Sequence, residues 1–192
     1  MLATERLILR SWEAKDLAPM VAICQDPRVM EYFPSLPDKE SIQQLIEKAN
    51  AHLNEHGTTL YAAECKDTGA LIGFIGIWLA DRFEAHFTPA YEIGWRLGHE
   101  HWGQGLATEG AKKTMEHAFH TLELPELVSF TSKINQRSIR VMEKIGLQHN
   151  PTDDFDHPEI EANSPLKAHV LYRLTREQTF FQNDSANKTL PS

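Results

Sequence analysis

The sequence predicts a single-domain, mixed α/β fold in which helices cover both faces of one sheet. Three observations support this prediction. Apolar residues recur at helical spacing in some segments, short apolar runs separate those segments, and a glycine-rich turn joins a predicted strand to a predicted helix. The 192 residues suffice for one well-packed domain but not for two of ordinary size. We expect this domain over residues 1–175 and a polar tail over residues 176–192.

The expected order of elements is β-α-α-β-β-β-α-β-α-β. The first strand covers residues 6–10, and the helix after it, at 13–24, has apolar residues at helical spacing. A second helix at 38–56 has one apolar stripe and ends before Gly57. Two strands at 59–64 and 71–79 follow, joined by a turn that contains Asp67 and Gly69.

The second half of the predicted fold begins with a strand at residues 89–97, which leads into the glycine-rich turn. That turn opens a helix at 105–122, and the remaining elements are a strand at 127–132, a helix at 136–145 and a final strand at 168–174. Between the last two, residues 149–165 are rich in Asp, Asn, Glu and Pro, and we expect a loop over one end of the sheet. Its acidic residues either attract a cation or are simply solvated; they are Asp153, Asp154, Asp156, Glu159 and Glu161.

Composition restricts the classes of function. A hydrophobic content of 41%, a charged content of 24% and no long apolar run are typical of a globular protein that does not span a membrane. The N-terminus lacks the pattern of a secretion signal, so we expect a cytoplasmic protein in which Cys24 and Cys65 are buried thiols. The net charge of −8 argues against nucleic-acid binding and favours cationic substrates such as amines.

The most informative segment is the glycine-rich turn at residues 102–110, of sequence WGQGLATEG. The first turn of a helix presents unpaired backbone N–H groups and the positive end of the helix dipole, and glycines allow an anion to approach them closely. No lysine follows the glycines, which argues against a P-loop, and the turn lies too late in the chain for a dinucleotide-binding fold. The turn therefore indicates a phosphate site. The alternative is that these glycines serve only a tight connection between strand and helix.

Together with the glycine-rich turn, two further motifs make the chain recognisable. These are residues 91–97, YEIGWRL, and residues 135–147, NQRSIRVMEKIGL. The chain resembles the GNAT superfamily of acyl-CoA-dependent N-acyltransferases and is most similar to its RimJ/RimL-like branch, the ribosomal-protein N-acetyltransferases. The resemblance extends from Thr4 to about Leu174, including DFDHP at residues 154–158 and HVLYR at residues 169–173. It implies the GNAT fold, with a mixed, mostly antiparallel sheet, and acetyl-CoA as co-substrate, without a metal.

The resemblance implies a set of coenzyme-binding residues. The turn would bind the pyrophosphate, the end of the preceding strand would pair with the pantetheine amides, and Asn135 would hydrogen-bond the pantetheine arm, although Asn is equally a helix N-cap. This set consists of Trp95, Arg96, Leu97, Trp102, Gly103, Gln104, Gly105, Leu106, Ala107, Thr108 and Asn135. Trp102 replaces the Arg or Gln that is usual in the family, which removes a polar side chain but no backbone amide.

The chemistry requires a base, because a primary amine has a pKa of about 10 and its protonated form has no lone pair. Glu92 lies in an apolar strand where burial would raise its pKa, so we expect it to be the base; alternatively it faces solvent or pairs with an arginine. Many GNAT enzymes have a proton-donating tyrosine seven residues after the asparagine, but Met142 occupies that position. The resemblance to the RimJ/RimL-like branch implies that Ser138, one helical turn after Asn135, serves the departing thiol instead, unless the thiolate leaves without an acid.

Two alternative functions remain. The chain could be an acyl-CoA-binding sensor or partner protein that has lost turnover. The sequence His52-Leu53-Asn54-Glu55-His56 also matches the pattern of an inverted zinc protease, although no third ligand is evident. For a transferase, the acceptor would be a protein N-terminal α-amine or a small-molecule amine. His157 and His169 are open as acceptor contacts, and a homodimer is possible.

Overall fold

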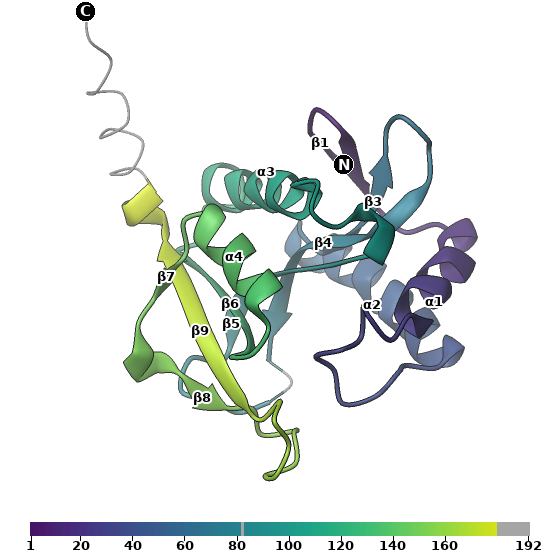
Figure 1. Cartoon of the computed structure of the whole chain (residues 1–192). Coiled ribbons are helices and arrows are strands. Elements are labelled where there is room, and N and C mark those ends of the chain that lie inside the picture. The colour runs from purple at the N-terminus through teal and green to yellow at the C-terminus, as the bar shows by residue number, and fades with distance from the viewer. Residues whose placement is uncertain (82, 180–192) are drawn as a thin grey trace, which may run out of the picture.

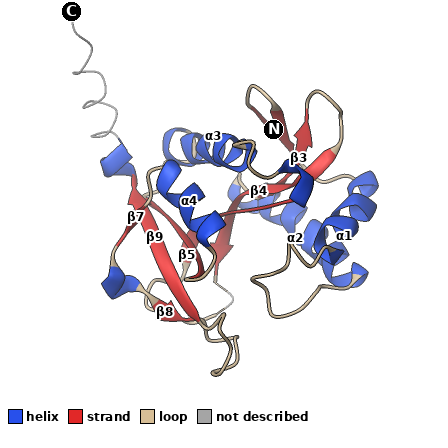
Figure 2. Cartoon of the chain, viewed as in Figure 1, coloured by secondary structure: helices blue, strands red, loops and turns tan. Residues whose placement is uncertain are grey.

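The structure, a computed structural model, describes residues 1–81 and 83–179. Within these residues, nine strands form one sheet, with four α-helices packed on it (Figure 1; Figure 2). The strands are β1 (Leu2–Ala3), β2 (Leu7–Arg10), β3 (Leu60–Cys65), β4 (Leu71–Ala80), β5 (Ala90–Leu97), β6 (Glu126–Ser132), β7 (Gln148–His149), β8 (Phe155–Asp156) and β9 (Ala168–Thr175). The helices are α1 (Leu17–Gln25), α2 (Lys39–His56), α3 (Leu106–His120) and α4 (Gln136–Lys144), with 3₁₀ turns η1 (Ala14–Asp16), η2 (His99–His101) and η3 (Pro151–Asp153).

The strand order is β1-β2-β3-β4-β5-β6-β9-β7, with β8 also paired to β9. Every pairing is antiparallel except that of β5 with β6, which is parallel and is connected through α3. A parallel pair needs such a crossover, whereas the antiparallel pairs β3–β4 and β4–β5 need only loops. The predicted mixed, mostly antiparallel sheet is confirmed.

The two faces of the sheet have separate cores. On β3, Tyr61 and Ala63 join the core under α3 and α4, whereas Ala62 between them joins the core under α1 and α2. This alternation follows from the two-residue period of a strand. Figure 1 shows α1 and α2 packed together on one side of the sheet, with α3 and α4 on the other. Helices therefore cover both faces, as predicted.

The structure also corrects several expectations. The helix expected at 13–24 is the 3₁₀ turn η1 followed by α1, because the Asp16 side chain accepts a hydrogen bond from the Glu13 backbone N–H at 2.8 Å and caps a tighter turn. Strand β1 was not predicted, and the expected loop at 149–165 contains η3 and β8. Two-residue strands such as β1, β7 and β8 are too short to show an alternating pattern.

Other expectations concern the thiols and the C-terminus. Cys24 is buried as expected, but Cys65 at the end of β3 is only half-buried. The first residues of the predicted tail, 176–179, are helical, and the rest of the tail lies outside the described residues. No helix in the described ranges combines the length and apolar character needed to cross a membrane.

A buried ion network ties β2 to η1 and β3. Arg10, which is 8% exposed, forms two hydrogen bonds with the Asp16 carboxylate, at 2.7 and 2.9 Å, and one with Glu64 at 2.8 Å. Asp16 is 1% exposed. Burial opposes ionisation of Asp16, but the bonds from Arg10 and the Glu13 backbone outweigh it, so the pKa of Asp16 lies below its ordinary value. The network fixes the chain where it leaves the sheet to form α1.

We predict that Asp16→Asn lowers the free energy of unfolding by about 3 kcal/mol at pH 7, because it leaves the Arg10 charge buried without its main partner. Since the folded pKa is depressed, the stabilisation is complete above the unfolded pKa of about 3.9 and is lost as the pH falls through the folded value. Urea denaturation between pH 7 and pH 3 should therefore show the difference between wild type and variant shrinking at the acid end. Asp26→Asn, which breaks the exposed pair with Arg28, is the control and should cost much less. A difference independent of pH would contradict this account.

Candidate active site

The glycine-rich turn places the first turn of α3 at the wall of a cavity. Gly103 and Gly105 have φ angles of 74° and 80°, in the left-handed region that favours glycine. Gly105 is the N-cap residue of α3 and has no side chain to occupy the helix terminus. Leu106, Ala107 and Thr108 therefore bring the unpaired amides of the first turn to a cavity that all three line. This arrangement can hold an anion.

The turn is braced from outside the cavity. Arg6 binds the Glu109 carboxylate at 2.6 and 2.7 Å and donates a hydrogen bond to the Gln104 carbonyl oxygen at 3.0 Å. Burial opposes ionisation of Glu109, but bonds from Thr4 and Arg6 outweigh it and lower the pKa of Glu109. Arg6 thus neutralises the carboxylate in the first turn of α3. Gln104 does not line the cavity; its side chain donates to the Glu100 carbonyl oxygen at 2.9 Å.

Trp102 connects the turn to its surroundings. Its indole N–H donates to the Leu97 carbonyl oxygen at 2.8 Å, at the end of β5. The guanidinium carbon of Arg137, on α4, lies 4.5 Å from the centre of a Trp102 ring. Trp102 therefore contacts both the end of β5 and the guanidinium of Arg137.

Strands β5 and β6 diverge towards the turn. Among the described residues, their only paired position is Glu92 with Val128, near the start of the shared segment. Beyond it, Trp95, Arg96 and Leu97 line the cavity on the open side of β5. Backbone groups of a strand that has lost its neighbour need other partners, and an extended ligand with amides can supply them.

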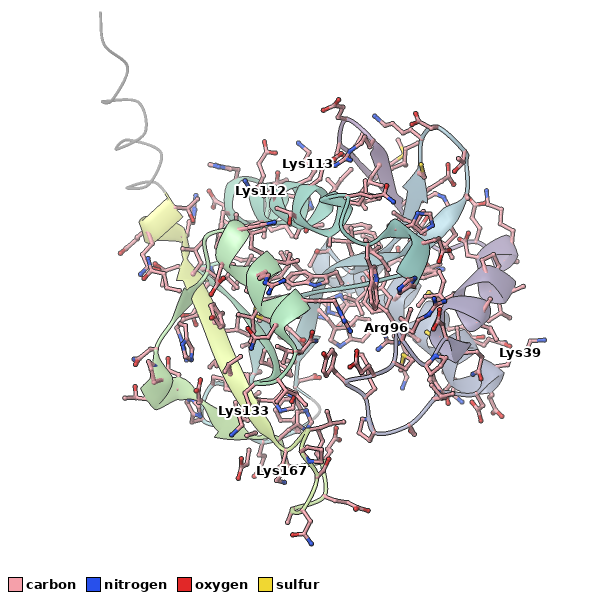
Figure 3. All side chains as sticks on the ribbon, viewed as in Figure 1. Lys39, Arg96, Lys112, Lys113, Lys133 and Lys167 are labelled. Carbon is pink, nitrogen blue, oxygen red and sulfur yellow. The ribbon has the colours of Figure 1, made fainter. Side chains whose placement is uncertain are left out.

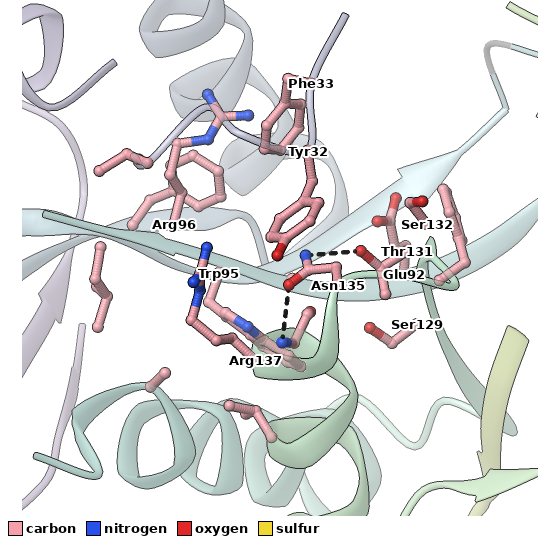
Figure 4. A pocket seen from close by; sticks show the side chains of 18 of the residues that line it. Tyr32, Phe33, Glu92, Trp95, Arg96, Ser129, Thr131, Ser132, Asn135 and Arg137 are labelled. Atoms are coloured by element: carbon pink, nitrogen blue, oxygen red, sulfur yellow. Dashed lines mark hydrogen bonds between the residues drawn. The ribbon is translucent and has the colours of Figure 1, made fainter. Parts of the chain in front are cut away.

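The cavity has a volume of about 620 Å³ and extends from the turn to Glu92 (Figure 4). Glu92 and Ser138 both line it and are half-buried. Asn135 also lines it and caps α4, since its side-chain oxygen accepts from the Ser138 backbone N–H at 3.2 Å while its amide donates to Thr131 at 3.0 Å. Met142 is fully buried in the core and can donate no proton. All of the expected site residues except Gln104 thus surround one cavity.

Several cavity residues were not predicted. Arg137, Arg140 and Lys144 line the wall formed by α4, and their spacing of three and four residues places them on one helix face. That spacing is visible in the sequence, but the direction of the face is not. Tyr32 and Phe33, from the segment between α1 and α2, also line the cavity, and Figure 4 shows Tyr32 pointing towards Asn135.

The two histidines left open as acceptor contacts line the same cavity. His169 and His157 have ring centres 5.0 Å apart and pack around Phe130. Burial lowers the pKa of His169 to about 4, so its imidazole is neutral near pH 7. Its Nδ1 lies 3.1 Å from the Lys167 carbonyl oxygen, which can only accept, so Nδ1 carries the proton.

The histidine pair considered for zinc has a different role. His52 is buried, and its Nδ1 contacts the Thr58 carbonyl oxygen at 2.7 Å while its Nε2 accepts from the Leu79 backbone N–H at 3.0 Å. Both ring nitrogens are used, and burial lowers the pKa of His52 further towards the neutral form. His52 therefore joins α2 to β4 and has no lone pair to offer a metal ion.

Comparison with known proteins agrees with this geometry. The family described as "Acetyltransferase (GNAT) domain" matches residues 6–148. The chain is 32% identical over 152 residues to the uncharacterised protein YkkB of Bacillus subtilis, covering 79% of this chain and 87% of that protein. It is 27% identical over 138 residues to the spermidine N(1)-acetyltransferase of Escherichia coli, covering 72% and 70% of the two chains.

A solved structure gives the same result for the fold. The crystal structure of a GNAT-family acetyltransferase from Bacillus anthracis superposes with a TM-score of 0.74 at 25% identity, covering 92% of this chain and 98% of that one. The matched family spans the turn, the diverging strands and the helix that carries Asn135. The chain therefore belongs to the GNAT superfamily and is an N-acetyltransferase.

Proposed function

We propose that this enzyme transfers an acetyl group from acetyl-CoA directly to a primary amine, with both substrates bound in the 620 Å³ cavity. The main support is that three features line one cavity: the N-terminus of α3, which can bind an anion, the end of β5, which is not paired with β6, and the Glu92 carboxylate. The finer assignment to the RimJ/RimL-like branch is part of this proposal and rests on the motifs at residues 91–97 and 135–147. The acceptor is a protein N-terminal α-amine or a small-molecule amine.

The residues around the turn fit the coenzyme. A Cβ atom built on Gly103 meets no atom within 4 Å, so the space above the turn is open to a pyrophosphate. Arg140 and Lys144 line the same cavity from α4 and would balance the phosphate charges. The backbone of Trp95 to Leu97 would pair with the pantetheine amides, and the Asn135 side chain would hold the same arm. Acetyl-CoA supplies an activated thioester there.

Glu92 is the proposed base. Its carboxylate belongs to the strand that would carry the coenzyme arm, so an amine approaching the thioester comes within its reach directly or through one water. A backbone N–H of β5 can stabilise the negative charge that develops on the carbonyl oxygen, without any reorganisation. The proposal requires Glu92 to accept one proton from the ammonium, so that the free amine attacks the thioester.

Ser138 is proposed to hydrogen-bond the departing sulfur. It is the third residue of α4, and its backbone is fixed by the Asn135 cap. A thiol with a pKa of about 8.5 is a good leaving group, so a hydrogen bond suffices and no strong acid is required. A coenzyme-binding protein without turnover would share the binding residues but give no acetylated product.

The first test is calorimetric titration of the metal-stripped protein with acetyl-CoA and with acetyl-4′-phosphopantetheine, which lacks the 3′,5′-ADP portion. We expect micromolar binding of acetyl-CoA and a loss of about a hundredfold or more with the truncated form, because several charge-assisted hydrogen bonds disappear. Absence of binding to both compounds would refute the transferase proposal and its sensor alternative together.

The second test separates the role of the turn from backbone strain. Gly103→Ala and Gly69→Ala both place a side chain at a positive φ, 74° and 66°, where no atom lies within 4 Å. Each should cost about 1 kcal/mol of stability, which thermal unfolding measures. Only Gly103→Ala should weaken acetyl-CoA binding, by about tenfold or more, because its methyl group would occupy the space of the pyrophosphate. If both variants bound acetyl-CoA with equal affinity, the assignment of the pyrophosphate to this turn would be wrong.

The third test concerns the base. Glu92→Gln should lower kcat/KM for an amine by at least about a hundredfold at pH 7. The residual rate should keep rising with pH, because only the small fraction of free amine then reacts and its pKa is about 10. Glu100→Gln, at the exposed η2 turn, is the matched control and should keep the wild-type profile. An unchanged rate across the pH range in Glu92→Gln would show that the base lies elsewhere.

A further inference from the structure

Arg96 occupies an unusual place for a cation. It belongs to β5 and lines the cavity, and its side chain extends towards α1 and Phe33 in the segment between α1 and α2 (Figure 4). Figure 3 shows Arg96 in the interior of the fold, whereas the lysines labelled there lie at the periphery. The guanidinium carbon is 4.3 Å from the centre of the Phe33 ring and 5.3 Å from that of Phe74. Two aromatic rings therefore fix its position.

This guanidinium lacks a counterion in the described part of the chain. None of the ion pairs among residues 1–81 and 83–179 includes Arg96. Its Nη1 meets only the weak acceptor Sγ of Cys24, at 3.4 Å, and its Nε is buried without a hydrogen-bond partner. Two carboxylates of the same segment are already paired, Asp26 with Arg28 and Glu31 with Arg137.

A half-buried guanidinium with unused donors is costly unless a ligand pairs with it. Arg presents five N–H donors in a planar fork that matches a carboxylate, and cation–π contacts replace only part of its lost hydration. The cost of burying a charge is offset only by an opposite charge with good hydrogen bonds. The missing partner is therefore expected on a molecule that enters the cavity.

The position of Arg96 indicates the acceptor rather than the coenzyme. Arg96 faces the α1 and α2 side of β5, whereas Trp95 next to it packs against the core under α3 and α4, the side of the phosphate-binding turn. Arg140 and Lys144 are available to the phosphates on that side. Glu92 and Arg96 are four residues apart on one strand and share a face, with their Cα atoms about 13 Å apart.

We propose that the acceptor is a small amine that also carries a carboxylate: the amine approaches Glu92 and the carboxylate pairs with Arg96. This inference rests on the proposed function. It disfavours polyamines for this chain, because a second ammonium group would then lie against the Arg96 guanidinium. It also indicates that several bonds separate the amine from the carboxylate of the acceptor, because the side chains of Glu92 and Arg96 span only part of the distance between their Cα atoms.

The test uses three six-carbon amines that differ only in the distal group: 6-aminohexanoate, 6-aminohexanamide and 1,6-diaminohexane. We expect wild-type kcat/KM, at saturating acetyl-CoA, to be at least about tenfold higher for the carboxylate than for the amide, and lowest for the diamine. Arg96→Gln should reduce the carboxylate-to-amide ratio to near one, and Arg96→Lys should restore part of it. The ratio is internal to each variant, so a general loss of activity does not imitate it.

Arg140→Gln is the matched control, because it removes a guanidinium that lines the same cavity from α4. It should raise the KM for acetyl-CoA but leave the carboxylate-to-amide ratio at the wild-type value. Equal rates with all three amines, or a ratio that survives Arg96→Gln, would overturn the inference while leaving the transferase proposal intact. A loss of acetyl-CoA affinity in Arg96→Gln without any change in the ratio would assign Arg96 to the coenzyme and also overturn it. Failure of acetyl-CoA binding in the wild type would refute the proposed function itself.

Discussion

The site depends on the divergence of two neighbouring strands. Strands β5 and β6 pair at Glu92 and Val128 and then separate, which opens the sheet at its one parallel junction. A parallel pair requires a crossover, and α3 provides it, so the start of α3 necessarily lies at the end of β5 beside the gap. One topological feature thus brings unpaired strand backbone and a free helix terminus into the same cavity. Closing the gap by further pairing would remove the place for an extended ligand.

Charge inside the cavity differs from the charge of the whole chain. The net charge of −8 favours cationic substrates, yet arginines and a lysine line the cavity from α4 and β5. Glu109, in the first turn of α3, is neutralised by Arg6. The net charge of a protein acts on a ligand over long distances, where salt screens the interaction. The binding of an ion in a partly buried site depends instead on the few charged groups that contact it. The acceptor is therefore better inferred from Arg96 than from composition.

The sequence predicted every α-helix and every strand of four or more residues that the structure describes. The helix at 38–56 and the strand at 71–79 lie within one residue of α2 and β4 at either end, because their periodicity and the cap at Gly57 are local signals. Strands β1, β7 and β8 escaped prediction because each is defined only by its partner. Likewise, Asn135 was recognisable as a cap, but nothing local in the sequence reveals that Arg96 lies between Phe33 and Phe74, which are distant in sequence.

A chain of contacts also joins the segment between α1 and α2 to the glycine-rich turn. Arg137 pairs with Glu31 in the segment before α2 and stacks on Trp102, which in turn binds the end of β5 through the Leu97 carbonyl oxygen. The segment that carries Phe33 is thus connected to the turn proposed to bind the coenzyme. The Arg137–Glu31 pair is exposed, and exposed pairs contribute little stability, so this connection can open at small cost. Direct transfer, as proposed, requires both substrates at once, and this chain of contacts connects the segment that carries Phe33 with the turn.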